Sequence, residues 1–252
     1  MVSIRLSHRM TATLDEEAVT NDLDILTVDE RERCDRFRFF RDRRDYAAAH
    51  ALARRALSAC CSIPPRSLLL EARAGGKPVL VPAQQGVPAV DFSISHADGL
   101  VACAIARGAH VGVDVESIGR SGIEQIAARY FSAVELKGME DTALADRRVR
   151  FIELWTLKEA YLKTLGVGLG LPLDSVAFQF DRSGGLASAV TDGASAGWQF
   201  ALFAVGSEFR MAVAARCEAE RPGCHIEFGP DLECSDRPVL VRSSSGITIG
   251  HG

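Results

Sequence analysis

The chain has 252 residues, of which 47% are apolar and 25% are charged, and its formal net charge is −4. These values predict a globular protein of one or two domains and exclude a disordered or collagen-like chain. The negative charge argues against a nucleic-acid binder. No stretch approaches the roughly 20 apolar residues of a spanning helix, and the N-terminus lacks a signal-peptide pattern, so no membrane contact is expected. Seven cysteines without a CxxC pair predict a soluble, cytoplasmic protein with reduced thiols.

The first part of the chain is predicted to form helices and then strands. Thr27 and Glu30 form a capping-box pattern, which predicts that a helix begins there and runs towards residue 40. A second helix is expected over 44–59, because two prolines follow it. Alternating residues and glycine-containing turns then predict a three-stranded meander at 92–95, 100–106 and 111–115.

The second part of the chain repeats this order of elements. Ser132 and Glu135 form another capping-box pattern, and a long helix is expected over 149–165. Strands are expected at 175–180, 186–190, 198–205 and 209–215. The pattern therefore indicates helices followed by strands, twice over.

This repeated order predicts an α+β fold with two similar halves, each made of helices packed on a small antiparallel sheet. The expected boundaries are 1–117 for the first half and 118–218 for the second. The remainder, 219–252, is rich in Pro, Gly and Ser and has no periodicity. It is expected to be a poorly structured tail.

Three carboxylates lie on two strongly patterned segments. Asp114 and Glu116 are two residues apart in an expected strand, so they point to the same face. Glu159 lies at the edge of a helical apolar stripe, and Lys163 follows one turn later. Each segment has an ordinary explanation, an acidic strand face and a helical ion pair. Together, however, the carboxylates are the hard oxygen ligands that Mg²⁺ prefers, and a shared metal would offset the cost of burying them.

Arginines are concentrated early in the chain. Nine of them lie between residues 31 and 55, at positions 31, 33, 36, 38, 41, 43, 44, 54 and 55. Because acidic residues are interspersed, one interpretation is a solvated helical surface with many ion pairs. The other is a site for a phosphate or an acidic protein partner, which the planar guanidinium suits. The two interpretations are compatible.

Other single features are ambiguous or negative. His96 ends an expected strand and by itself is more typical of a structural histidine. Lys77 follows two glycines and precedes Pro78, a weak signal for a fixed cation on a loop. The spacing of Cys217, Cys224, His225 and Cys234 is unlike that of a structural zinc site. Neither a GxxxxGK[ST] loop nor a GxGxxG loop after a strand is present, so NTPase and dinucleotide-binding functions lack support.

Four short motifs nevertheless follow one another along the chain, and their order is more specific than any one of them. They are Lys77-Pro78; Phe92-Ser93-Ile94-Ser95-His96; Gly112-Val113-Asp114-Val115-Glu116; and Phe151-x-x-x-Trp155-x-x-Lys158-Glu159-Ala160-x-x-Lys163-x-x-Gly166-x-Gly168-Leu169. Over roughly residues 28–216 the chain resembles the 4′-phosphopantetheinyl transferases, specifically the longer, surfactin-synthetase-activating type. Each motif alone is weak, whereas the ordered set is specific. The tail after residue 218 lies outside the resemblance.

The resemblance implies a fold and a reaction. Long members of this family are pseudo-dimers of two α+β halves that act as single chains. They transfer the phosphopantetheine arm of coenzyme A to a serine of an apo acyl or peptidyl carrier protein and release adenosine 3′,5′-bisphosphate. By this resemblance, Asp114, Glu116 and Glu159 would hold Mg²⁺, and Glu159 would act as base directly or through a metal-bound water. Lys163 would contact the phosphates.

Further coenzyme A contacts are implied in the same way. Ser95 and His96 would lie against the 3′-phosphate, with Lys77 and Pro78 near the adenine. Lys158 would reach towards the phosphates or solvent. Arg33 and Arg44 are the expected arginine contacts of the 3′-phosphate, although the arginine cluster does not match the family letter by letter. The carrier protein would dock on the early helices of the second half, around 123–139.

Three alternatives belong to other classes. A non-catalytic module that binds coenzyme A or a carrier protein would be expected to lack a carboxylate or Lys163, yet all are present. A Mg²⁺-dependent nucleotide phosphohydrolase could use the same three carboxylates. An RNA-binding protein could use the arginines, but the sequence lacks the aromatic stacking platform of common RNA modules.

Overall fold

The structure is a computed structural model. It describes residues 1–73, 75–81, 89–122, 127–168, 171–181, 185–190, 197–217, 223–229 and 237–250. The helices are α1 (Glu16–Leu23), α2 (Val28–Asp35), α3 (Phe40–Cys61), α4 (Ala127–Tyr130), α5 (Ala133–Glu140) and α6 (Arg147–Leu165), with 3₁₀ turns at Pro65–Ser67, Leu144–Asp146 and Leu173–Ser175. No helix in this part of the chain is long and apolar enough to cross a membrane.

The strands form two main sheets and two small hairpins. They are β1 (Val2–Met10), β2 (Leu70–Ala72), β3 (Pro78–Leu80), β4 (Val90–Ala97), β5 (Leu100–Arg107), β6 (Ala109–Ser117), β7 (Val176–Phe180), β8 (Leu186–Val190), β9 (Trp198–Val205), β10 (Phe209–Cys217), β11 (Cys224–Phe228), β12 (Val239–Ser243) and β13 (Ile247–Gly250). The first sheet has the order β13-β11-β1-β5-β4 and the second the order β12-β9-β10-β6. The hairpins are β2-β3 and β7-β8.

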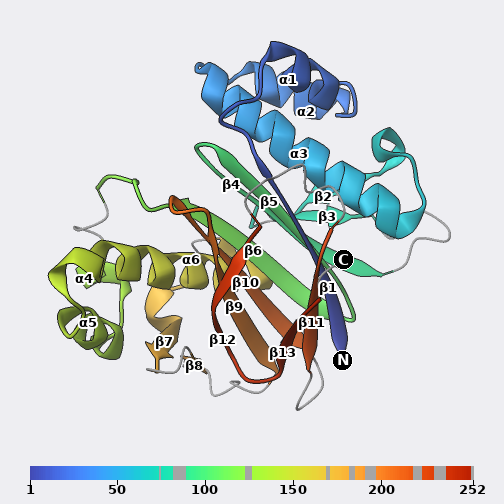
Figure 1. Cartoon of the computed structure of the whole chain (residues 1–252). Helices are drawn as coiled ribbons and strands as arrows, with labels where there is room; N and C mark the ends of the chain where they lie inside the picture. Colours follow the sequence, from blue (N-terminus) through green and yellow to red (C-terminus); the bar gives the residue numbers. More distant parts are fainter. Residues whose placement is uncertain are drawn as a thin grey trace.

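The two main sheets pack face to face, and each carries a helix on its outer face (Figure 1). The alternation of each strand sorts its side chains between layers. On β5, Ala102 and Ala104 face the other sheet, whereas Val101 and Ile105 pack under α3. The second sheet is covered by α6 in the same way, through residues such as Leu157. The layers are therefore helix, sheet, sheet and helix, which confirms an α+β fold.

The capping boxes begin helices where the sequence predicts them. Thr27 and Glu30 exchange side-chain and backbone hydrogen bonds at the start of α2, and Ser132 and Glu135 do so at the start of α5. Helix α6 lies very close to β6 at Gly112. Any side chain at this position would collide with the α6 backbone. This close approach brings the faces of α6 and β6 that carry the predicted carboxylates together.

The strand pairing corrects two expectations. The meander is wrong at its third strand, because β6 pairs with β10 and not with β5. The two sheets therefore divide at Gly108 rather than after residue 117. The positive φ of this glycine (72°) lets the chain turn from one sheet into the other.

The expectation of a poorly structured tail is also wrong for the described part of 219–252. Strand β11 runs parallel to β1, β13 runs parallel to β11, and β12 pairs with β9. The first sheet is consequently mixed rather than antiparallel. Burial of apolar side chains explains why this part of the chain forms strands, since Cys224 and Ile226 are fully buried between the sheets. The last strands thus belong to both sheets in turn, joining the two halves.

Candidate active site

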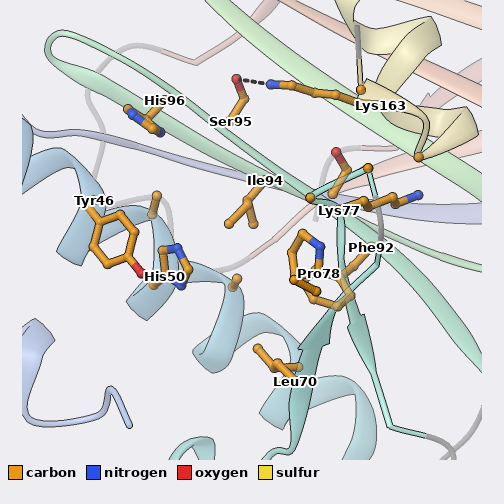
Figure 2. A pocket seen from close by; sticks show the side chains of 18 of the residues that line it. Tyr46, His50, Leu70, Lys77, Pro78, Phe92, Ile94, Ser95, His96 and Lys163 are labelled. Atoms are coloured by element: carbon orange, nitrogen blue, oxygen red, sulfur yellow. Dashed lines mark hydrogen bonds between the residues drawn. The ribbon is translucent and has the colours of Figure 1, made fainter. Parts of the chain in front are cut away.

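A pocket of about 700 Å³ lies along the seam where β4 of the first sheet meets β6 of the second. Its walls come from α2, α3, the segment 75–78, β4, β6 and the C-terminal half of α6. Figure 2 shows its lining, with α3 side chains on one wall and β4 side chains on the other. The predicted site residues that line it are Arg33, Lys77, Pro78, Ser95, His96, Asp114, Glu116, Glu159 and Lys163.

At one end of the pocket a lysine bridges the two sheets. Lys163 Nζ donates to Asp114 Oδ1 and to Ser95 Oγ, at 2.7 Å in each case (the bond to Ser95 is drawn in Figure 2). Ser95 Oγ in turn donates to Asp114 Oδ1 at 2.9 Å. The other carboxylate oxygen, Asp114 Oδ2, is buried and has no hydrogen-bond partner. An unpartnered buried carboxylate oxygen is costly and needs a cation or a donor.

The two glutamates are partly desolvated beside Asp114. Burial, followed by the charge of Asp114, raises the pKa of Glu116 to about 7. The same two causes raise the pKa of Glu159. Trp155 Nε1 donates to Glu116 Oε1 at 2.9 Å, and Arg120 pairs with the same carboxylate. Mutual repulsion of these carboxylates means that added positive charge would stabilise their ionised forms.

These carboxylates suit a hard divalent cation by their chemistry. All three offer oxygen ligands, and Asp114 Oδ2 is buried and has no hydrogen-bond partner. As they stand, no three His, Cys, Asp or Glu side chains among the described residues are clustered closely enough to hold a metal. The ammonium of Lys163 instead occupies Asp114 Oδ1. The donor set therefore fits Mg²⁺, whereas the side-chain arrangement is that of an ion pair.

The other end of the pocket is lined by aromatic and histidine rings. The rings of Tyr46 and His50 are stacked with centroids 4.1 Å apart, and both point into the pocket from α3 (Figure 2). His96 faces them from the end of β4. Desolvation and the charge of Lys163 lower the pKa of His96. Arg33 is exposed at the edge of this end.

A buried ion-pair network supports this aromatic wall. Glu30 Oε1 lies 3.0 Å from His50 Nδ1, and Glu30 Oε2 accepts from Arg54 Nε at 2.7 Å. Burial raises the pKa of Glu30, but the hydrogen bonds from His50, Arg54 and the backbone of Thr27 outweigh it and lower the pKa to about 2. Glu30 therefore starts α2 and also holds His50 in place.

Lys77 lines the pocket with its stem rather than its charge. Its Nζ donates to Asp91 Oδ2 at 2.6 Å and to the Val111 carbonyl at 2.8 Å. The stem lies against Gly166, at the C-terminal end of α6. Pro78 beside it presents an apolar surface to the pocket (Figure 2).

Two predicted contacts lie elsewhere. The prediction for Lys158 is wrong, because its side chain is fully buried in the second half, where Nζ contacts Glu135 Oε2 at 2.9 Å and the Leu173 carbonyl at 2.7 Å. Its position within the apolar stripe turns it away from the carboxylates. Arg44 is likewise buried outside the pocket lining, and Asp45 and Asp98 pair with its guanidinium.

Sequence reasoning missed Tyr46, His50 and Asp91. Tyr46 and His50 lie one helical turn apart on the expected second helix, so an aromatic and a titratable residue on one face was the available signal. Asp91 precedes the β4 motif at a strand-alternation position. None of the three belongs to the ordered motifs.

Fold and site thus define a two-half α+β protein with a pocket along the seam of its sheets. Residues 15–107 match the family model for the 4′-phosphopantetheinyl transferase N-terminal domain, and residues 110–214 match the model for the 4′-phosphopantetheinyl transferase superfamily. These matches meet at the point where the sheets divide. The chain belongs to the 4′-phosphopantetheinyl transferases, of the Sfp type.

Curated relatives agree over most of the chain. A 4′-phosphopantetheinyl transferase of Bacillus subtilis is 28% identical over 190 residues, covering 75% of this chain and 82% of the relative. The transferase Sfp of Bacillus subtilis strain 168 is 27% identical over 223 residues, covering 88% and 93%. The transferase HetI of a Nostoc species is 31% identical over 147 residues, covering 57% and 61%.

Proposed function

We propose that this chain transfers the 4′-phosphopantetheine moiety of coenzyme A to a serine hydroxyl of an apo acyl or peptidyl carrier protein. The observation that carries this proposal is the convergence of all four sequence motifs on one pocket, which residues of both halves line. The pocket has an end with aromatic and histidine rings suited to a nucleotide and an end with carboxylates and a lysine suited to phosphate chemistry. The released product would be adenosine 3′,5′-bisphosphate.

Mg²⁺ would be held by Asp114, Glu116 and Glu159. Bound there, it would neutralise charge on the pyrophosphate of coenzyme A. The unpartnered Asp114 Oδ2 and the raised pKa values of the two glutamates support this assignment. Lys163 would then contact a phosphate oxygen, since phosphate and carboxylate are both ionised acceptors for its ammonium.

The chain's own residues would move the proton and stabilise the charge. The serine oxygen forms a bond to the phosphorus that carries the pantetheine, and the bond from that phosphorus to the bridging oxygen breaks. Glu159 accepts the serine proton, because it lines the pocket one helical turn from Lys163, where a carboxylate within reach of the hydroxyl can act as the general base. Lys163 stabilises the negative charge that develops on the phosphate oxygens.

Coenzyme A would span the seam. Its 3′-phosphate would lie near Ser95, His96 and Arg33, and its adenine near Pro78 and the Lys77 stem. The ammonium of Lys77 is already engaged by Asp91, so Lys77 would contribute shape rather than charge. Because one chain supplies the whole pocket lining described above, we propose that the protein acts as a monomer.

The carrier protein would dock beside the carboxylate end, on α4 and α5. The expected region 123–139 lies partly outside the described residues, at 123–126. In the described part, Val134 is exposed on α5, and Leu144 and Arg147 are exposed just beyond it. These exposed apolar side chains and the cationic Arg147 would contact an acidic partner helix.

The test is mass spectrometry of apo carrier proteins of the acyl, polyketide and peptide-synthetase types, incubated with the protein, coenzyme A and Mg²⁺. The expected product is one phosphopantetheine on the carrier serine, formed at least about 100-fold more slowly when Glu159→Gln replaces the wild type. A serine-to-alanine carrier is the matched substrate control. Absence of an adduct on every carrier type would refute transfer. Release of the bisphosphate without a carrier would instead support the phosphohydrolase alternative.

A further inference from the structure

Strands β4 and β6 run side by side at the seam, yet they belong to different sheets and are not neighbours in the described hydrogen-bonded ladders (Figure 1). They are joined by side chains instead. Alternate β4 side chains accept hydrogen bonds from alternate backbone N–H groups of β6. The three rungs are Asp91 Oδ2 with Val111 N at 2.8 Å, Ser93 Oγ with Val113 N at 3.1 Å, and Ser95 Oγ with Val115 N at 3.3 Å.

The geometry of the strands explains this side-chain ladder. Both strands repeat every two residues, so every second β4 side chain meets every second β6 amide. The other edge of β6 is paired with β10. Without the ladder, the amides of Val111, Val113 and Val115 would be buried without partners, which natural proteins avoid.

Lys77 adds a second link between β4 and β6 at the first rung. Its Nζ donates both to Asp91 Oδ2 and to the Val111 carbonyl, so one cation contacts both strands. The Lys77 side chain is only 7% exposed and Asp91 16%. His110 Nδ1 also lies 3.7 Å from Asp91 Oδ2, but this ring is largely exposed. Close by, Gly75 lies so near the Gly166 carbonyl that no side chain would fit there.

We infer that Asp91 is a positioning residue for the transfer reaction and that it acts through the ladder with Ser93 and Lys77. The ladder holds β4, which carries His96, against β6, which carries Asp114. Asp91 itself is not among the pocket-lining residues. This inference rests on the proposed function, because it explains how the two parts of the coenzyme A site are kept in register.

Register matters because the ligand spans both strands. A slip of one residue along a strand is about 3.3 Å, whereas a misplacement of about 1 Å can cost roughly 100-fold in rate. A loosened seam could be restored by the bound ligand, at the expense of its binding free energy. The expected result of loosening is therefore a higher KM for coenzyme A with kcat at saturation largely retained.

The test compares Asp91→Ala with Asp91→Asn in the full chain. Alanine removes the acceptor of the Val111 N–H and of the Lys77 ammonium, whereas asparagine keeps an acceptor oxygen in the same place. For Asp91→Ala we expect hydrogen exchange of the Val111 amide, measured by NMR, to rise at least about tenfold. We also expect the KM for coenzyme A to rise about tenfold and kcat to change less than about threefold. Asp91→Asn should stay within about threefold of wild type in both.

Leu57→Val is the control for general destabilisation, because Leu57 is fully buried in the first half and lies outside the pocket lining. It should leave the KM unchanged. If Asp91→Ala does not fold, the matched pair Asp91→Thr and Asp91→Val tests the same rung outside the pocket lining, since the two differ only in a hydroxyl of the kind by which Ser93 accepts from the Val113 N–H on the next rung. Valine should expose the Val111 amide and raise the KM, and threonine should do both less.

The outcomes separate the two proposals. A wild-type protein that neither binds coenzyme A by calorimetry nor modifies any carrier would overturn the proposed function. A wild-type protein that is active, combined with an Asp91→Ala variant whose Val111 amide is exposed but whose KM is normal, would overturn the positioning role. An equal rise of KM in Leu57→Val would overturn it too.

Discussion

Replacing Lys158 by methionine should destabilise the protein strongly and leave coenzyme A binding intact. Lys158 Nζ contacts Glu135 Oε2 at 2.9 Å, and neither side chain is exposed at all. The same ammonium donates to the carbonyls of Leu173 and Val176. Glu135 in turn starts α5 and accepts from the Phe178 N–H at 3.0 Å. This pair therefore ties α5, α6 and β7 together inside the second half.

The size of the effect follows from what is left behind. Methionine fills most of the lysine volume, so little cavity forms and the lost charge dominates. An uncompensated buried carboxylate typically costs about 3–5 kcal/mol. With a urea m value of about 2 kcal/mol/M, this lowers the unfolding midpoint by roughly 2 M. The double variant Lys158→Met with Glu135→Gln removes both charges and should recover part of that loss.

Urea unfolding followed by circular dichroism measures this cost. Lys137→Met is the matched control, because Lys137 is an exposed lysine on α5, and it should shift stability by less than about 0.5 kcal/mol. The affinity of Lys158→Met for coenzyme A, measured by calorimetry below the unfolding transition, should equal that of the wild type. A loss below about 1 kcal/mol would contradict the buried ion pair. A large loss of coenzyme A affinity would restore Lys158 as a ligand.

Three further changes give distinct expected outcomes. Glu159→Gln should lower kcat at least about 100-fold without changing the urea midpoint by more than a few tenths of a molar, because it removes the proposed base; full activity would remove Glu159 from the mechanism. Glu30 has a pKa of about 2 in the folded protein against an ordinary 4.5, so its stabilisation is present above pH 4.5 and is lost as pH falls through 2. After allowance for solvent screening this is about 1–2 kcal/mol, and acid titration of the wild type against Glu30→Gln should show the loss only in the wild type; parallel curves would contradict it. Ile226→Ala, in β11, should cost about 2–5 kcal/mol, since its side chain is fully buried; a cost near zero in urea unfolding would return the segment 224–228 to the status of a loose tail.

Local chemistry in the sequence was sufficient for the helix starts and for one face of the site. The capping boxes at Thr27 and Ser132 satisfy their own amides within four residues, so no distant partner is needed to predict them. Strand alternation similarly put Asp114 and Glu116 on one face. That prediction is confirmed, because Val113 and Val115, on either side of Asp114, are buried between the sheets.

Tertiary structure decided the partners. β6 reads as the third strand of a meander, but its amides bind β10 on one edge and β4 side chains on the other. The segment 224–228 lies in a stretch rich in Pro, Gly and Ser that shows no periodicity, but its Cys224 and Ile226 are buried in the space between the two sheets. Lys158 lies within the apolar stripe of its helix, where the sequence shows no partner for its charge, and the fold brings Glu135 to it from another helix. Each depends on residues far apart in the chain, whose contacts form only when the sheets pack, and periodicity within one segment carries no information about them.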